Sequence, residues 1–441
     1  MTQQPRESIN HMTATDDHDV DVDSINLSDS AFWARPLEDR HAAFAALRRH
    51  KPIAFFEEPE LPPIPRGPGY WALSSYKDVV EVSRHPETWS SSQGTSSVTD
   101  MPPEAVEFFG SFINMDDPRH ARQRGIVSRR FTPRQLGHVF ESVAAVADEL
   151  IDGIIDEGEV NLVERISVPF PLLIICDMMG IPRSEYSTIE TATNSILGGG
   201  DADFIGEQDT YAAALGGGMT LVQVMNDLAE FKRHNPGDDL TSALVNADVG
   251  QDMLTPAELG AFFILLAVAG NDTTRTAISH GMHYLSQNPD QRRIWQQNLA
   301  EVTPTAVEEI VRYGAPVVFM RRTATTTTEL GGRAFHQGDK VVMFYGSANR
   351  DETVFANPDS FDVTREDNPH VGFGGPGPHF CLGAHLARRE VGVMFNKLLT
   401  RLPDIQAVEP PVLINPTGMP LVTGVKRLKV QFTPGGTGRP L

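Results

Sequence analysis

The segment from Phe373 to Gly383 carries the clearest chemical signal in the chain. It reads Phe-Gly-Gly-Pro-Gly-Pro-His-Phe-Cys-Leu-Gly, and Cys381 stands directly before a stretch with helical periodicity. A helix N-terminus lowers the pKa of a thiol through its dipole and its unpaired N–H groups. The glycines and prolines predict a tight loop with little bulk, against which a flat macrocycle can lie. A thiolate on heme iron favours O–O cleavage, so the loop predicts an iron ligand.

A buried structural cysteine beside a glycine-rich turn is the simpler interpretation of a lone cysteine, and Cys176 keeps it. The ordered spacing Gly-x-His-x-Cys-x-Gly, which ends at Gly383, favours the ligand instead. A dinucleotide-binding loop does not fit, because Phe380 replaces the third glycine of that motif and the prolines spoil the phosphate-binding backbone.

A second candidate site lies in the middle of a long apolar helix predicted over residues 255–287, where Gly270, Asp272 and Thr273 interrupt the apolar run. Thr273 can bond the carbonyl four residues earlier or a guest water. An acid beside an alcohol can pass protons to bound dioxygen. A kinked helix whose threonines satisfy themselves is the structural alternative, but an acid in an apolar helix favours function.

Two charged pairs share helical faces. Glu309 and Arg312 stand three residues apart, a common surface arrangement worth about 0.2–0.5 kcal/mol. His120 and Arg124 stand four residues apart and could grip the carboxylates of a cofactor. A solvated basic face explains the second pair equally well.

Periodicity predicts the elements that must position these residues. The expected helices cover residues 36–50, 75–84, 117–130, 135–157, 168–179, 221–234, 255–287, 303–313 and 382–402. The expected strands cover residues 70–73, 322–330, 333–336, 340–344 and 422–431. Thr255, Pro256 and Glu258 predict a capped start for the long helix. The fold class is therefore mostly α with a minor β part, in a single large domain with a long central helix.

Composition narrows the function classes. The net charge of −21 argues against nucleic-acid binding and against anionic membranes. The longest apolar run, residues 259–270, is too short to span a membrane, and the N-terminus has no apolar signal region, so we expect a cytoplasmic protein. Residues 1–30 are acidic and predict a disordered tail before a globular domain over 31–441.

Taken together and in this order, the basic pair, the acid–alcohol pair, Glu-x-x-Arg and the cysteine loop resemble the cytochrome P-450 superfamily, from about residue 31 to 430. The resemblance implies heme b (iron protoporphyrin IX) as cofactor. It implies an axial ligand at Cys381, propionate contacts at His120, Arg124, Arg322 and His379, proton delivery by Asp272 and Thr273, an oxygen groove at Gly270, and a structural triad of Glu309, Arg312 and Arg365. The family's usual Phe seven residues before the cysteine is Gly374 here, with Phe373 one position earlier.

Segments 175–182, 263–266 and 316–322 are similar to those of an actinobacterial subgroup that hydroxylates methyl-branched lipids and sterol side chains. We therefore expect a monooxygenase that uses dioxygen on an apolar substrate such as a methyl-branched fatty acid, sterol or terpenoid. The expected pocket wall comprises Ala267, Val268, Val317, Val318, Phe319 and Leu421. Glycines at 198–200 and 216–218 predict a mobile lid.

No flavin or nicotinamide domain is recognisable, so a separate ferredoxin and ferredoxin reductase are expected to supply electrons. A basic cluster is expected to suit an acidic ferredoxin; it comprises Arg122, Arg129, Arg130, Arg388 and Arg389. A solvated charged face is the alternative. Three other functions stay open: a thiolate-heme peroxygenase or non-oxygenase on the same fold, a non-catalytic heme-binding protein, and a cofactor-free binding protein in which Cys381 is only structural.

Overall fold

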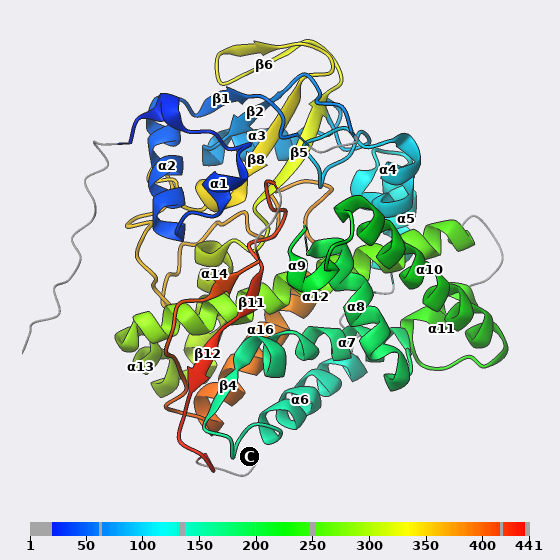
Figure 1. Ribbon diagram of the computed structural model, residues 1–441, viewed down its shortest axis with the longest axis vertical. Coiled ribbons are helices and arrows are strands. Elements are labelled where there is room, and N and C mark those ends of the chain that lie inside the picture. Colours follow the sequence, from blue (N-terminus) through cyan, green and yellow to red (C-terminus); the bar gives the residue numbers. More distant parts are fainter. Residues whose placement is uncertain are drawn as a thin grey trace, which may run out of the picture.

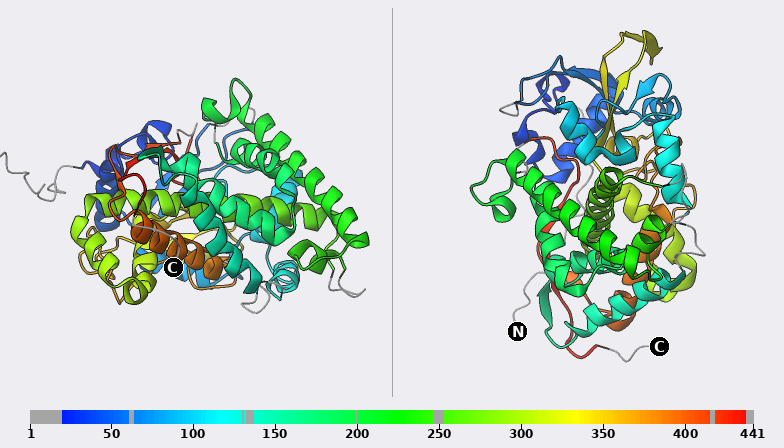
Figure 2. Two further views of the ribbon diagram at one scale, coloured as in Figure 1. Left: turned by 90° about the horizontal axis from the view of Figure 1, so that it is seen from below. Right: turned by 90° about the vertical axis from the view of Figure 1, so that its right-hand side faces the viewer.

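The computed structural model describes residues 20–60, 64–129, 131, 137–198, 200–246, 253–414 and 418–436. A sheet-containing part lies at the top of Figure 1 and a helical part below it, and helix α12 crosses the molecule between them. The left view of Figure 2 shows α16 lying alongside α12. This arrangement agrees with the predicted mostly α fold with a minor β part.

The central helix α12 spans Pro256–Gln287, 32 residues, or about 48 Å at 1.5 Å per residue. Its start is the predicted one. Thr255 is the N-cap, its side chain accepts the Glu258 N–H, and Glu258 in turn accepts the Thr255 N–H. Two orphan N–H groups are thereby satisfied. This local signal fixes where α12 begins, and with it the distance along the helix to the residues in its middle.

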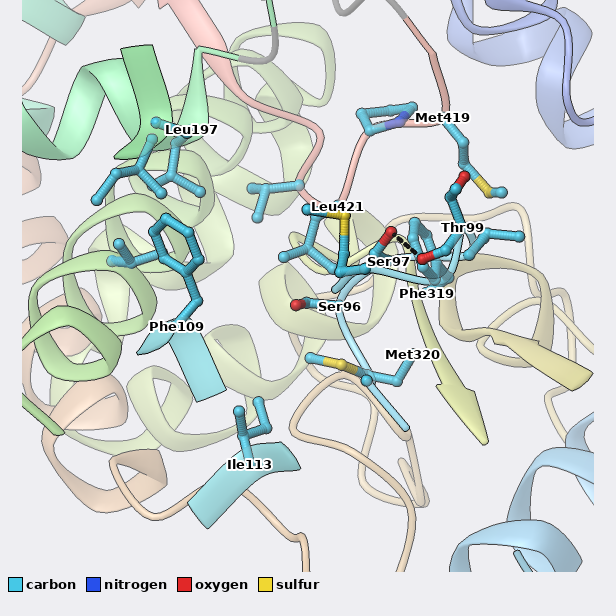
Figure 3. A pocket seen from close by; sticks show the side chains of 18 of the residues that line it. Ser96, Ser97, Thr99, Phe109, Ile113, Leu197, Phe319, Met320, Met419 and Leu421 are labelled. Carbon is cyan, nitrogen blue, oxygen red and sulfur yellow. Dashed lines mark hydrogen bonds between the residues drawn. The ribbon is translucent and has the colours of Figure 1, made fainter. Parts of the chain in front are cut away.

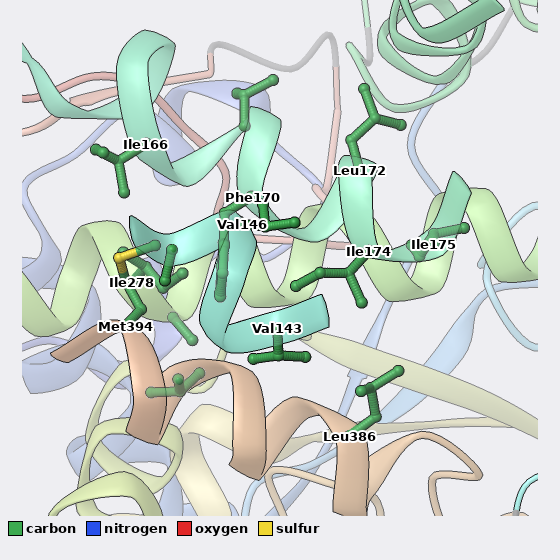
Figure 4. Close-up of a cluster of buried hydrophobic side chains, with 14 of the residues drawn as sticks. Val143, Val146, Ile166, Phe170, Leu172, Ile174, Ile175, Ile278, Leu386 and Met394 are labelled. Atoms are coloured by element: carbon green, nitrogen blue, oxygen red, sulfur yellow. The ribbon is translucent and has the colours of Figure 1, made fainter. Parts of the chain in front are cut away.

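The main core lies between α12 and the helices below it. Figure 4 shows buried side chains from α6 (Gly137–Asp152), α7 (Pro169–Met179), α12 and α16 (Ala384–Arg401) meeting in one cluster. Ile278 of α12 and Met394 of α16 are both buried in it. This packing holds α16, and the cysteine loop before it, against the central helix.

The largest sheet has the strand order β1-β2-β8-β5-β3. Strand β2 (Tyr70–Leu73) pairs in parallel with β8 (Lys340–Phe344), and β8 pairs antiparallel with β5 (Phe319–Ala324). The predicted strand over 322–330 is in fact two strands, because β6 (Thr328–Leu330) turns away to pair with β7 (Arg333–Phe335).

The remaining helices are α1 (Ser30–Trp33), α2 (Leu37–His50), α3 (Tyr76–Arg84), α4 (Pro103–Gly110), α5 (Arg119–Ser128), α8 (Tyr186–Leu197), α9 (Ala202–Ile205), α10 (Thr210–His234), α11 (Leu240–Val245), α13 (Pro289–Gln297), α14 (Leu299–Gly314) and α15 (Tyr345–Ala348). The remaining strands are β1 (Ile53–Phe56), β3 (Trp89–Ser90), β4 (Glu159–Asn161), β9 (Gln406–Ala407), β10 (Val412–Leu413), β11 (Val425–Arg427) and β12 (Lys429–Gln431).

The predicted boundary of the tail at residue 30 is too late. Residues 1–19 lie outside the described part of the chain, but Ile25 and Leu27 are buried against the sheet side of the molecule. The Trp33 indole N–H donates to the Leu27 carbonyl at 2.7 Å. Two apolar residues in an otherwise acidic stretch are enough to anchor it, so the ordered domain begins before residue 30.

The glycines at 216–218, which the sequence predicted to form a mobile lid, lie inside helix α10, and their mobility stays a prediction. A Cβ on Gly217 would meet the Ala192 carbonyl at 2.5 Å, and one on Gly218 would meet the Phe108 ring at 2.7 Å. The glycines therefore permit close packing of α10 against α8 and α4. In the other glycine-rich segment, residues 198–200, Gly199 lies outside the described residues.

Candidate active site

Glycines shape the cysteine loop. Gly374 has φ +88°, a conformation that side chains disfavour. A Cβ on Gly377 would collide with the Ser83 carbonyl of α3, so the loop runs directly against that helix. The Cys381 N–H donates to the Phe373 carbonyl at 2.9 Å, which closes the loop just before α16. Cys381 is exposed, and it lines a cavity between this loop and α12.

Two sets of electrostatic effects change the pKa of the Cys381 thiol in opposite directions. Although Cys381 is exposed to the cavity, the protein packed around the thiol desolvates it and raises its pKa, while a hydrogen bond from the Gly383 backbone and the charges of Arg124 and Arg388 act to lower it. The predicted pKa-lowering effect of the helix start is present but does not prevail in the protein alone. Positive charge in the cavity would add to the three groups that favour the thiolate.

Arg124, Arg322 and His379 line one edge of the same cavity, and His120 lies against His379. The rings of His120 and His379 lie 4.3 Å apart, and His379 Nε2 lies 3.1 Å from Ser91 Oγ. Burial first, then the charges of Arg322, His120 and Arg124, lower the pKa of His379 to about 2. Such a cluster has a surplus of donors and positive charge. It suits carboxylate groups entering from the cavity.

The middle of α12 faces the cavity from the other side. Thr273 Oγ1 donates to the Ala269 carbonyl at 2.7 Å, so the helix stays closed there. Gly270 also lines the cavity, and a Cβ on it would meet Ile175 of α7 at 2.8 Å. Asp272 is buried, and its carboxylate lies 3.4 Å from Arg275. Burial raises the pKa of Asp272 and the Arg275 charge partly opposes that rise.

A second buried acid was not predicted. Glu390 of α16 lines the cavity and accepts a hydrogen bond from Thr274 Oγ1 at 3.1 Å. Burial raises the pKa of Glu390 to about 8, and the Thr274 bond only partly opposes this. The signal was available: Glu390 lies four residues after Leu386 and four before Met394, so it shares their apolar face.

The structure brings Glu309, Arg312 and Arg365 into contact. Glu309 and Arg312 form a bidentate pair at 2.7 and 2.8 Å, both fully buried, and Arg365 Nε lies 3.1 Å from the same carboxylate. Arg312 also donates to the carbonyls of Asn349 and Pro358 at 2.8 Å. The pair that looked ordinary in the sequence is thus a buried network tying α14 to the segment before the cysteine loop.

A second cavity adjoins the first and contacts Thr273 and Asp272. Its wall is largely apolar and includes Val268, Val317, Phe319 and Leu421, as expected. Unpredicted wall residues come from loops, helix ends and strand β5, and Figure 3 labels several of them: Ser96, Ser97, Thr99, Phe109, Ile113, Leu197, Met320 and Met419.

Two expected wall residues lie elsewhere. Ala267 is fully buried in the main core, because it points about 100° around α12 from Val268. Val318 packs in the cluster beside Phe44 and Phe344, because neighbouring residues of an extended chain face opposite ways. Both residues are apolar, as a pocket wall requires, but each lies on the side of its chain segment that faces away from the cavity.

Two arginines of the expected basic cluster form ion pairs with carboxylates of the protein itself. Arg122 pairs with Glu258 at 2.8 Å, and Arg388 pairs with Glu308 at 2.5 Å. Arg130 lies outside the described residues, whereas Arg389 is exposed beside Phe140. The surface near the cysteine loop therefore offers fewer free cations than the sequence indicated.

Comparisons with known proteins identify the family. Residues 219–432 match the family model described as Cytochrome P450. The chain is 46% identical over 421 residues to a methyl-branched lipid omega-hydroxylase of Mycobacterium bovis, covering 94% of this chain and 96% of that protein. It is 38% identical over 404 residues to a steroid C26-monooxygenase of Rhodococcus jostii, covering 90% and 83%.

A solved structure agrees in fold. A Mycobacterium marinum cytochrome P450 in complex with pseudoionone is similar with a TM-score of 0.87 at 41% identity, covering 93% of this chain and 98% of that one. The fold is thus that of a heme enzyme whose iron chemistry activates oxygen. The chain belongs to the cytochrome P450 family, and it is a P450 monooxygenase with heme b as cofactor.

The residues around the first cavity fit that cofactor. His120 Nε2 is buried and has no hydrogen-bond partner among the described residues, although it sits beside Arg124 and His379. The cavity places a thiol at one face and cationic groups at one edge, as an iron porphyrin with two carboxylates requires.

No helix of the described chain is long and apolar enough to cross a membrane.

Proposed function

We propose that this monooxygenase hydroxylates a methyl-branched lipid, sterol or terpenoid side chain, with electrons from a separate ferredoxin and its reductase. The observation that carries the substrate class is the largely apolar second cavity, which meets the first at Ala269 and Thr273. The names of the two curated relatives, a lipid omega-hydroxylase and a steroid C26-monooxygenase, support the same class.

The chain's own residues divide the work of holding the cofactor. Cys381 would ligate the iron, and His120, Arg124, Arg322 and His379 would bind the propionates. When bound, heme supplies oxygen activation and C–H hydroxylation. The buried triad of Glu309, Arg312 and Arg365 would hold the segment that leads to the cysteine loop, and would act on folding rather than on chemistry.

Asp272 and Thr273 of α12 would transfer protons on the side of the cavity opposite the cysteine loop. Asp272 is buried, burial raises its pKa and so makes the carboxylate easier to protonate, and Arg275 keeps that carboxylate oriented at 3.4 Å. Thr273 Oγ1 donates its own proton to the Ala269 carbonyl at 2.7 Å, and because Thr273 lines both cavities we expect its oxygen to be free to accept a proton from there. A hydroxyl so placed can accept a proton and pass it on.

Branched apolar substrates would fill the second cavity by shape and burial. Phe109, Ile113, Leu197 and Leu421 offer aliphatic and aromatic surface on opposite sides of it (Figure 3). Burial of apolar surface gives about 25 cal/mol per Å². The far larger apolar than polar lining therefore favours a hydrocarbon tail over a hydrophilic substrate.

The decisive experiment measures whether an oxygen atom from dioxygen is incorporated into the product. Purified holoprotein is incubated with a branched lipid, a surrogate ferredoxin, its reductase, NADPH and ¹⁸O₂, and products are analysed by mass spectrometry. We expect one ¹⁸O atom in a hydroxylated product, and a carbon monoxide difference band at the wavelength typical of thiolate ligation. Product with peroxide alone and none with dioxygen would favour the peroxygenase. Heme binding without any turnover would favour a non-catalytic protein.

A further inference from the structure

All the charged side chains among the described residues that line the second cavity are acidic. Among the described residues that line it there is no Lys, Arg or His, and the only carboxylates are Glu60 and Asp272. Asp272 is paired with Arg275, and Glu60 pairs with Arg66 at 2.9 Å at the exposed end. Nothing on this part of the wall can therefore neutralise an anion.

Two cations lie behind the wall but are already engaged. Arg321 and Lys340 are buried, and both donate to the carbonyl of Val98, at 3.2 and 3.3 Å. Arg321 pairs with Asp100 at 2.7 Å, and Lys340 pairs with Glu58 at 2.5 Å and with Asp100 at 2.7 Å. Their charges hold the loop from outside the cavity.

That loop presents neutral polar groups to the cavity. Ser96, Ser97 and Thr99 lie across the space from Phe109 and Leu197 (Figure 3). Ser97 Oγ donates to the Thr99 carbonyl at 2.9 Å, which fixes the loop's shape. Ser96 is exposed to the cavity side, and no hydrogen bond joins it to another described residue. One hydroxyl is thus available to a ligand.

A buried carboxylate without a counter-ion is strongly disfavoured, whereas a hydroxyl, ketone or ester needs only one hydrogen bond. The net charge of −21 adds long-range repulsion of anions. We propose that the natural substrate has an uncharged polar end group, which meets the Ser96–Ser97 segment, and that free fatty acids are selected against. This proposal rests on the branched-lipid function and narrows it.

The test compares three ligands that share one branched isoprenoid tail. They are the primary alcohol, the corresponding carboxylic acid, and the methyl ester of that acid. Binding to the ferric holoprotein at pH 7.5 is measured by the Soret shift and, independently, by calorimetry. We expect the alcohol and the ester to bind at least tenfold more tightly than the acid. An acid that binds as tightly as the alcohol would overturn the proposal.

A matched pair of variants isolates the charge. Ser96→Lys should raise the ratio of acid to alcohol affinity at least tenfold, whereas Ser96→Gln, of similar size but neutral, should leave that ratio near its wild-type value. Equal ratios in the two variants would contradict the proposal.

The failure of the underlying function has its own signature. If none of the three ligands shifts the Soret band or releases heat while the carbon monoxide spectrum is normal, the branched-lipid assignment is wrong, and this inference falls with it. If all three bind equally, only the inference about charge falls.

Discussion

At the scale of single residues, Glu390 is a buried acid that the sequence analysis did not predict, and it makes the stability of the protein depend on pH. Its carboxyl is buried beside Thr274, and burial raises its pKa to about 8. An unfolded glutamate titrates near 4.3. Between these values the folded chain keeps a proton that the unfolded chain has released, so the free energy of unfolding falls as pH rises.

Replacing Glu390 by Gln removes this titration. We expect Glu390→Gln to gain stability relative to wild type as pH rises from 5 to 8, by at most about 1.4 kcal/mol per pH unit. Denaturation midpoints at several pH values measure the difference. A gap between the two proteins that stays constant with pH would contradict the raised pKa.

Glu308 provides a control of opposite sign. Burial opposes its ionisation, but hydrogen bonds from His370 and Arg388 outweigh burial and hold the pKa of Glu308 at about 2. Its stabilising effect is complete above the unfolded value and is lost only as pH falls toward 2. Glu308→Gln should therefore lose a nearly constant amount of stability over the same range from pH 5 to 8.

The buried triad makes a second prediction at this scale. Glu309→Ala leaves Arg312 fully buried without its counter-ion, which costs about 3–5 kcal/mol. We expect a low yield of folded protein and a markedly lower denaturation midpoint. Glu329→Ala, on an exposed strand position, is the control and should behave like wild type.

At the scale of elements, the glycines of α10 make a paired prediction. Gly216→Ala meets nothing within 4 Å and should stabilise the helix by about 0.5–1 kcal/mol. Gly217→Ala should instead destabilise the protein by about 1–3 kcal/mol, because its Cβ meets the Ala192 carbonyl of α8 at 2.5 Å. Thermal midpoints of the two variants check this. Two equal increases would refute close packing of α8 and α10.

Elements with local signals could be predicted from the sequence. The start of α12 follows from Thr255, Pro256 and Glu258, and strand β2 matches its predicted bounds. The first half of α10 was missed, because helix propensity penalises Gly216–Gly218 while tertiary packing requires two of them. Propensity is local, and the packing partner is not visible in the sequence.

The candidate site divides in the same way. The cysteine loop and the acid–alcohol pair are contiguous motifs, so the sequence located them. The substrate wall is assembled from residues near 97, 109, 197, 320 and 419, which share no periodicity. Even where α12 was predicted correctly, Ala267 and Val268 were both placed on the wall, although they point about 100° apart and only the neighbouring helices decide which of them faces the cavity.

At the scale of the whole molecule, charge is distributed unevenly. The chain carries −21 overall, yet Arg388 and Arg389 follow closely after Cys381. Arg388 is paired with Glu308 and its guanidinium lies 4.4 Å from the Phe373 ring, so it serves the loop's structure. Arg389 is exposed on the same helix. For the ferredoxin proposed above, we therefore expect Arg389 rather than Arg388 to provide the electrostatic attraction.

Reversing this charge should slow electron transfer without affecting the substrate. We expect Arg389→Glu to reduce the rate of heme reduction by an acidic ferredoxin roughly tenfold at low salt, with the difference shrinking as ionic strength rises, because steering is screened. Stopped-flow reduction under carbon monoxide measures the rate, and Soret titration checks that substrate affinity is unchanged. Arg233→Glu on α10 changes the net charge equally and should reduce normally. Equal slowing in both variants would show that only the total charge matters, and docking near the cysteine loop would be wrong.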